Sequence, residues 1–297
     1  MPSAGLSPKP ASDPIAITGA SGAIGGRIAR RLSERGFPLR LVARDPSRAP
    51  DLPNTQVAAA SYSDRDSMIK ALTGIGTLFM VSAHEAIDRL DQHTQAVEAA
   101  AAAGVRKIVY LSFLGASPEA TFVLARQHYH TEQLIKETGA DFVFLRDALY
   151  TDVVPLLVGS DHVIRGPAGQ GRAGFVARDD VAEAAAAVLA STGHDGNTFD
   201  LTGPESIDLE EAAERLGRFI GRDVTYHNET EPEAYASREV YGAPDWEVEG
   251  WVTSYLAIAK GEMDLTSDAV ARLTGHDPMN LEAFLAAHPE SYQHLLS

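Results

Sequence analysis

The chain has no cysteine and no long hydrophobic run. Without a thiol it can form no disulfide, no Cys-ligated zinc site and no thiol nucleophile, and this composition is typical of proteins from a reducing cytoplasm. No apolar stretch approaches the ~20 residues that a membrane helix needs, so we expect no membrane insertion. Residues 1–12 are rich in proline and serine. We expect a flexible tail there rather than a signal peptide.

Basic residues are also scarce. The sequence has 25 Lys and Arg against 41 Asp and Glu, which leaves a net charge of −16. Such a charge disfavours a nucleic-acid partner or an anionic membrane. The charge is uneven, because seven arginines lie between Arg27 and Arg48, whereas 19 acidic residues face six basic ones from Leu201 onward. The basic segment indicates a small anionic ligand, although part of it is explained as a solvated helix face.

The first two thirds of the chain alternate short apolar runs with helical patterns. Strands alternating with helices indicate βαβ units and a parallel sheet covered on both faces. Right-handed crossovers then give an α/β fold with a doubly wound sheet. The predicted strands are 14–18, 39–43, 77–82, 107–112, 142–146 and 197–201, and the predicted helices are 25–35, 64–72, 86–103, 121–137 and 179–189.

The most informative segment is ITGASGAIGG, from Ile17 to Gly26, between the first strand and the first helix. Gly19 allows a tight turn, Gly22 lets the backbone approach a pyrophosphate, and Gly25 lets the helix pack closely on the strand. The helix N-terminus directs free N–H groups and a positive dipole end at the phosphates. A strand, three glycines at this spacing and a helix together predict dinucleotide binding by a Rossmann-type fold.

The residue after the second strand selects the cofactor. A carboxylate about 20 residues after the glycine loop would bind the ribose 2′-OH of NAD. Arg44 stands at that position, with Arg48 one turn further. Because a guanidinium can bind a 2′-phosphate in bidentate fashion, we expect a preference for NADP(H). NAD(H) stays an alternative: if Asp45 faces the cofactor and Arg44 turns outward, the preference reverses.

The rhythm of strands and helices changes after Tyr150. Residues 158–174 are predicted as loop and turn, and the acidic stretch beyond 203 carries helical patterns near 209–220, 251–260, 267–273 and 281–287. We therefore assign 13–155 and 174–202 to the Rossmann domain. The remaining segments, 156–173 and 203–297, are expected to form a smaller, partly helical lid domain over the substrate.

Several segments resemble the atypical short-chain dehydrogenases/reductases, near the NmrA-like family. TGASGAIG is similar to the TGAxGxxG of that group, and LVARDPSR resembles the NmrA-type segment after the second strand. Further stretches resemble type 2 NAD(P)H:quinone oxidoreductases: ASYSDRDSMIKAL, FMVSA, QHTQAVEAAAAAGVRKIVYLSFLGA, HYHTEQLIKETGADFVFLRDALY and GFVARDDVAEAAAAVL. The resemblance extends from Ile15 to about Gly203 and is loose beyond it.

This resemblance implies that the cofactor lies over the strand ends. Two of the implied contacts, Ser82 and Ser112, have an alternative explanation as strand-end serines satisfied by the backbone. The implied positions are Gly19, Ser21, Gly22, Ala23 and Ile24 at the pyrophosphate, Ser61 and Tyr62 beside the adenine, Ser82 and Ala83 at the ribose, and Ser112 and Phe113 at the nicotinamide end.

The usual proton donor of the group is absent. Short-chain dehydrogenases carry Tyr-x-x-x-Lys on the helix after the strand that ends at Ser112, and here those places hold Leu124 and His128. Leucine cannot transfer a proton, so alcohol–ketone chemistry by the tyrosine mechanism is not expected. His128 and Ser112 become the candidate catalytic residues, with His128 also at the cofactor. The alternative for His128 is a helix histidine paired with Glu132.

Two functions fit these observations. Quinones need little from a protein after hydride transfer, because water or a weak acid can protonate the quinol oxygens. The chain is therefore expected to reduce a quinone or a similar planar acceptor with NADPH, with Tyr150 facing either the substrate or the core. The alternative is a non-catalytic NADP(H) sensor that regulates a partner protein, as NmrA-like proteins do. The resemblance also implies a homodimer, and no metal-ligand spacing is evident.

Overall fold

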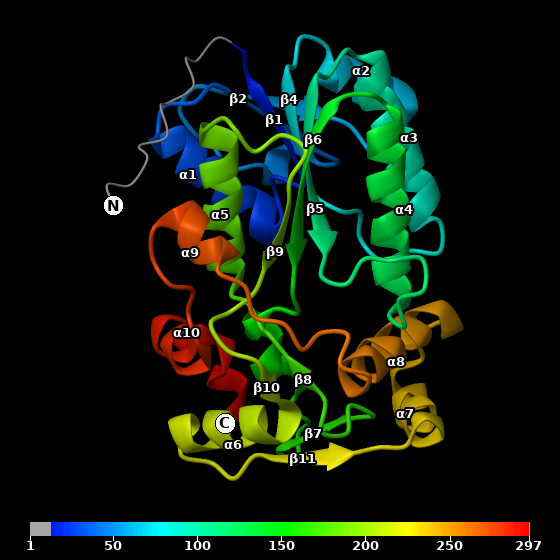
Figure 1. Ribbon diagram of the computed structural model, residues 1–297, viewed down its shortest axis with the longest axis vertical. Helices are drawn as coiled ribbons and strands as arrows, with labels where there is room; N and C mark the ends of the chain where they lie inside the picture. The colour runs from blue at the N-terminus through cyan, green and yellow to red at the C-terminus, as the bar shows by residue number, and fades with distance from the viewer. Residues whose placement is uncertain (1–12, 297) are drawn as a thin grey trace. The chain divides into compact units, whose positions relative to one another are not determined.

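A computed structural model describes residues 13–296, and the expected tail at 1–12 lies outside the described residues (Figure 1). The central sheet has seven strands in the order β3-β2-β1-β4-β5-β6-β9. Their bounds are β1 Ile15–Thr18, β2 Leu39–Ala43, β3 Thr55–Ala59, β4 Thr77–Met80, β5 Lys107–Phe113, β6 Asp141–Asp147 and β9 Thr198–Leu201.

Strand β1 lies in the middle of this sheet and explains the apolar run that predicted it. All four of its residues are buried, because it pairs in parallel with β2 on one side and β4 on the other. Thr18 pairs with Val42, so the loops that follow β1 and β2 leave the same edge of the sheet. Ligands bind at this carboxyl edge in doubly wound folds.

Helices cover both faces of the sheet (Figure 1). Helices α1 and α5 lie on one face, and α2, α3 and α4 lie on the other. The core on the second face includes Met68, Val97, Tyr110, Ile135 and Phe144. The predicted α/β fold with a doubly wound sheet is therefore confirmed. The bounds are α1 Ala23–Glu34, α2 Arg65–Leu72, α3 Arg89–Ala102, α4 Val123–Glu137 and α5 Arg178–Ala190, with a 3-10 turn at Pro46–Arg48.

The chain forms two compact units. The first contains residues 13–112, 129–146 and 181–199, and the second contains 113–128, 147–180 and 200–296. The division of the chain into a Rossmann domain and a lid at the boundaries given above stays a prediction. No helix within 13–296 is long and apolar enough to span a membrane.

The second unit has a core of its own, built around buried side chains such as Val154, Ile164, Leu216 and Phe284. Two small sheets support it: β7 pairs in parallel with β11, and β8 pairs antiparallel with β10. Its elements are β7 Val163–Gly166, β8 Arg172–Ala173, β10 Ile207–Asp208, β11 Thr225–Asn228, α6 Leu209–Ile220, α7 Glu231–Arg238, α8 Asp245–Ala259, α9 Ala269–Thr274 and α10 Leu281–Ala287, with 3-10 turns at Thr151–Leu157, Glu239–Tyr241, Pro289–Ser291 and Gln293–Leu295.

Several of these elements correct the sequence prediction. Residues 158–174 were predicted as loop and turn, but they contain β7 and β8. Both strands are short and pair with segments that lie more than 30 residues away, so no local pattern reveals them. Strand β3 was missed because it is a half-exposed edge strand without apolar alternation. Helix α7 was also missed, and α8 begins at Asp245 rather than near 251.

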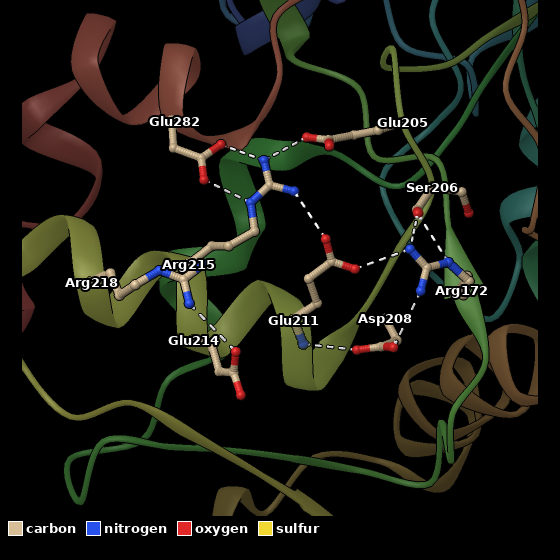
Figure 2. Close-up of polar contacts among 9 residues, drawn as sticks. All are labelled: Arg172, Glu205, Ser206, Asp208, Glu211, Glu214, Arg215, Arg218 and Glu282. Carbon is tan, nitrogen blue, oxygen red and sulfur yellow. Dashed lines mark hydrogen bonds and ion pairs between the residues drawn. The ribbon is translucent and has the colours of Figure 1, made fainter.

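An ion-pair network ties α6 to its neighbours in the second unit (Figure 2). The Arg215 side chain is 10% exposed and donates to Glu282 of α10 and, at 2.6 Å, to Glu205. Glu211 connects Arg215 to Arg172 of β8, whose guanidinium is 3.0 Å away. Arg172 also donates to the Ser206 carbonyl. The network links three parts of the chain that are distant in the sequence: β8, residues 205–215 and α10.

Candidate active site

The glycine loop after β1 has the geometry that its sequence predicts. Gly19 has φ +60°, a left-handed conformation that favours glycine. A Cβ on Gly25 would lie 2.4 Å from the Gly19 carbonyl oxygen, so only glycine allows α1 to pack this closely on the end of β1. The Gly22 N–H donates to the Gly19 carbonyl at 2.8 Å. Helix α1 follows with no side-chain cap on its first turn.

The loop therefore presents a helix N-terminus without a side-chain competitor. Ser21, Gly22 and Ala23 are exposed, whereas Ile24 and Gly25 are buried. The first turn of α1 contains no acidic residue. Free N–H groups and the positive end of the helix dipole attract an anion at such a place.

Two arginines follow β2 on the same edge of the sheet. Arg44 and Arg48 are exposed, and neither side chain makes a hydrogen bond or an ion pair within residues 13–296. The Asp45 side chain between them, in contrast, is hydrogen-bonded to Ser47. Its carboxylate accepts from the N–H of Ser47 at 3.0 Å and from the Ser47 hydroxyl at 2.6 Å. These hydrogen bonds lower the pKa of Asp45 and cap the short 3-10 turn that follows.

Tyr62 holds the loops after β1 and β4 together. Its hydroxyl lies 2.5 Å from Thr18 Oγ1 and 2.6 Å from the Val81 carbonyl oxygen. Thr18 Oγ1 in turn accepts from the Val81 N–H at 2.9 Å. Burial raises the pKa of Tyr62, so the hydroxyl stays protonated. Ser61, its neighbour, lies 2.9 Å from the Ser63 hydroxyl.

The segment after β4 is fixed by two buried side chains that the sequence did not reveal. His93, fully buried on α3, accepts from the Ala83 N–H through Nε2 at 2.8 Å. Arg89, also buried, donates to the Ala83 carbonyl at 2.9 Å. Both backbone groups of Ala83 are thus held from α3. Within residues 13–296 the adjacent Ser82 hydroxyl makes no hydrogen bond and is half-buried.

His93 is held in one tautomer. Its Nδ1 lies 2.8 Å from Thr131 Oγ1, and because Nε2 accepts from Ala83, Nδ1 carries the proton. Burial, followed by the nearby charge of Arg89, lowers the pKa of His93 well below its usual value. The only signal for this role in the sequence is the i,i+4 spacing of Arg89 and His93, which puts two polar side chains on one helix face.

Ser112, a predicted catalytic and cofactor residue, is fully buried at the end of β5. Its hydroxyl donates to Glu132 Oε1 at 2.7 Å. Arg146 forms a bidentate pair with the same carboxylate, through Nε at 2.8 Å and Nη2 at 2.7 Å. The Ser112 proton is therefore committed to Glu132, and the oxygen keeps its capacity to accept. The group Ser112, Glu132 and Arg146 lies wholly within the first unit.

The other predicted residues lie in the second unit. His128 is 6% exposed, and its ring lies 6.1 Å from the ring of Phe113. Leu124, one turn earlier on α4, packs against the apolar core of this unit. Tyr150 is half-buried just after β6, where its hydroxyl donates to Asp147. The described residues contain no group of three or more His, Asp and Glu side chains arranged for a metal ion.

These residues fit a bound dinucleotide. The packing at Gly25 leaves no room for a side chain between α1 and the turn that follows β1. Beside it, the uncapped start of α1 offers N–H groups to a pyrophosphate. After β2, Arg44 and Arg48 offer two exposed guanidiniums that form no ion pair with the described residues.

Comparison with known proteins gives the same assignment. A sequence profile described as NAD(P)H-binding matches residues 19–192. Quinone oxidoreductase 2 of Escherichia coli (strain K12) is 31% identical over 290 residues, which cover 95% of this chain and 99% of that protein. A crystal structure of the E. coli NADPH-dependent quinone oxidoreductase with NADPH has a TM-score of 0.84 at 30% identity, covering 95% of this chain and 100% of that one.

Two further structures extend the comparison. Triphenylmethane reductase from Citrobacter sp. has a TM-score of 0.81 at 29% identity, covering 92% of this chain and 99% of that one. NmrA, a negative transcriptional regulator in complex with NADP, has a TM-score of 0.75 at 14% identity and covers 96% of this chain and 95% of its own, a likeness of fold alone. The resemblance drawn from the sequence motifs is therefore confirmed.

Proposed function

Because the chain belongs to the NAD(P)H-binding family and is an oxidoreductase, we propose that it transfers hydride from NADPH to a quinone or a similar planar, electrophilic acceptor. The observation that supports NADPH as the cofactor is that the exposed guanidiniums of Arg44 and Arg48 form no ion pair within residues 13–296. The Asp45 carboxylate, which would favour NAD(H), is already bonded to Ser47. A 2′-phosphate would satisfy both arginines.

The proposed class of acceptor is supported by the related proteins. One of them is named a quinone oxidoreductase, and another reduces triphenylmethane dyes. Both acceptor classes are conjugated and electrophilic. When bound, NADPH would supply the hydride. Leu124, at the place of the usual catalytic tyrosine, supports an acceptor that does not require that tyrosine.

We propose roles for the remaining residues from the family resemblance. The loop Gly19–Gly25 would bind the pyrophosphate through its N–H groups. The Ser82 hydroxyl would bind the cofactor ribose beside Ala83, which His93 and Arg89 hold in place. Ser61 would lie at the adenine, and Ser112, Phe113 and His128 at the nicotinamide end.

The test compares NADPH with NADH in wild type and in Arg44→Ala, with a benzoquinone as acceptor. We expect wild type to prefer NADPH. Arg44→Ala should raise the KM for NADPH about 10- to 100-fold, the loss of one charge-assisted hydrogen-bonded contact, and leave the KM for NADH nearly unchanged. The measurement is the initial rate of absorbance loss at the dihydronicotinamide band.

Arg30→Ala is the matched control, because Arg30 is an exposed arginine of the same unit on α1. It should leave both KM values at the wild-type level. Equal use of NADPH and NADH by wild type would contradict the role of Arg44. Saturable NADPH binding without turnover of any acceptor would instead support the sensor alternative.

A further inference from the structure

Asp147 and Tyr150 form an unusual pair at the carboxyl end of β6. Asp147 is the last residue of the strand and is 3% exposed. The Tyr150 hydroxyl, three residues later, donates to Asp147 Oδ2. The Tyr150 ring is only half-buried, so its carboxylate partner is the more deeply enclosed of the two. The pair therefore joins a buried carboxyl group to the hydroxyl of a half-buried tyrosine ring.

The surroundings hold this pair in place. The Leu114 N–H donates to the Asp147 carbonyl at 2.8 Å, and the Thr151 N–H donates to the Val176 carbonyl at 2.9 Å. The Arg178 guanidinium lies 4.5 Å from the centre of the Tyr150 ring. Asp152 fixes Arg178 from the other side, with Nη1 3.5 Å from Oδ1. A donor with so little freedom needs little reorganisation when it reacts.

Charge and burial prepare the pair to exchange a proton near neutral pH. Burial raises the pKa of Asp147 to about 7, although the hydrogen bond from Tyr150 and the charge of Arg178 oppose the shift. Burial, followed by the negative charge of Asp147, raises the pKa of Tyr150. Arg178 lowers and Asp152 raises the pKa of Tyr150. The carboxyl group is thus the member of the pair that titrates.

We propose that Tyr150 is the proton donor to the reduced acceptor and that Asp147 is its proton source. This role rests on the proposed function. When Asp147 is protonated, its O–H donates to the Tyr150 oxygen and frees the Tyr150 hydrogen for an acceptor oxygen. When Asp147 is ionised, that hydrogen is committed to the carboxylate, as in the observed geometry. The donor works only in the protonated state.

The step balances as follows. A quinone takes two electrons and one hydrogen from NADPH as hydride, which leaves NADP+ and a negative charge on the quinone oxygen. The Tyr150 O–H bond breaks as the O–H bond of the quinol forms, and the Asp147 proton passes to the Tyr150 oxygen. Water then returns a proton to Asp147. A cationic triphenylmethane dye, in contrast, becomes neutral on accepting hydride and takes no proton.

This difference between acceptors supplies the test. Tyr150→Phe should lower kcat with a benzoquinone about 10²-fold, a typical contribution of a positioned general acid. With crystal violet the same variant should keep kcat within about twofold of wild type, because that reaction has no proton to deliver. A merely structural tyrosine would lower both rates together. Both rates are measured with NADPH at saturation.

The pH profile is the second readout. In wild type, kcat with the quinone should fall as pH rises through about 7, where Asp147 loses its proton. With crystal violet, kcat should stay flat from about pH 6 to 8. Asp147→Asn should lower the quinone rate and remove the fall with pH, because the amide does not titrate.

Tyr226→Phe is the matched control. The Tyr226 hydroxyl, also in the second unit, donates to the Gly166 carbonyl at 2.7 Å, and within residues 13–296 it forms no hydrogen bond with a carboxyl group. Its loss should leave the ratio of quinone to dye turnover unchanged. An unchanged ratio in Tyr150→Phe would overturn the role of the pair alone. Wild type that reduces neither acceptor would overturn the proposed function and this role together.

Discussion

At the scale of single residues, Asp147 combines deep burial with an ionisable group. Its carboxyl is harder to ionise in the folded chain than in the unfolded one, because burial raises its pKa from 3.8 to about 7. Between these two values the folded state holds more protons than the unfolded state. Stability contributed at this site is therefore present below pH ~4 and lost as pH rises toward 7. A loss of folding stability at neutral pH is common where function requires a buried ionisable group.

The consequence for Asp147→Asn is a pH-dependent gain in stability. At pH 8 the variant should exceed wild type in unfolding free energy by on the order of 2 kcal/mol, because the charged form is no longer buried. At pH 5, which lies inside the window between about 4 and 7, the gain should be clearly smaller than at pH 8. Denaturant unfolding at both pH values measures the difference. The control is Asp161→Asn, an exposed carboxylate whose pKa Arg165 lowers to about 2, which should show the same effect at pH 5 and 8. A gain of equal size at both pH values would rule out burial as its cause.

At the scale of elements, α6 carries two arginines that differ in their surroundings. Arg215 is 10% exposed and contacts three carboxylates, from Glu205, Glu211 and Glu282. Arg218, one turn on, is 67% exposed and faces only Glu214 among the ion pairs of the described residues (Figure 2). The hydrogen bonds from Arg215 lower the pKa of Glu282. Arg215, rather than Arg218, is therefore the residue of α6 that joins the helix to α10 and to Glu205.

Replacing Arg215 should loosen the contact between α6 and α10. Arg215→Ala is expected to lower the unfolding free energy by about 1–3 kcal/mol, less than a fully buried pair because its partners are partly solvated. Arg218→Ala, an exposed i,i+4 pair on the same helix, should cost less than about 0.5 kcal/mol. Urea denaturation of both variants at one ionic strength compares them. Equal losses would show that the network adds nothing beyond a surface pair.

At the scale of the whole molecule, the acidic residues outnumber the basic ones by 16, and the surplus is concentrated beyond Leu201. The basic segment from Arg27 to Arg48 is an exception that serves a small ligand in the proposed function. A duplex would meet repulsion from most of the surface, because it needs a continuous run of cations along its backbone.

We therefore expect no binding to duplex DNA. A fluorescent duplex of random sequence should show no anisotropy change at about 10 μM protein and about 0.1 M salt, where nonspecific DNA-binding proteins are often partly bound. NADPH added to the same sample should still bind, which serves as the positive control for folded protein. Salt-sensitive binding to DNA that NADPH displaces would place nucleic acid on the basic segment and contradict this expectation.

The sequence by itself determined the glycine loop and every strand of the central sheet except β3. A buried central strand such as β1 requires an apolar run, and the packing of α1 against the Gly19 carbonyl excludes every side chain larger than hydrogen at Gly25. These are demands of the local backbone, so they are visible in adjacent residues. Arg44 could be predicted for the same reason, since its place follows directly from the end of β2.

Only the tertiary structure decided which polar groups meet. His93 and Arg89 hold Ala83, and Ser112 shares Glu132 with Arg146, across separations of up to 20 residues. The partners in these contacts lie on different elements, so their separation in the sequence follows no helix or strand period. Whether Asp147 stands beside water or beside Tyr150 depends on burial, which the whole fold creates. The conformation of the cofactor loop can thus be predicted from residues that are adjacent in the sequence. The pKa values of buried groups and the positions of their side chains depend on contacts that exist only after the chain has folded.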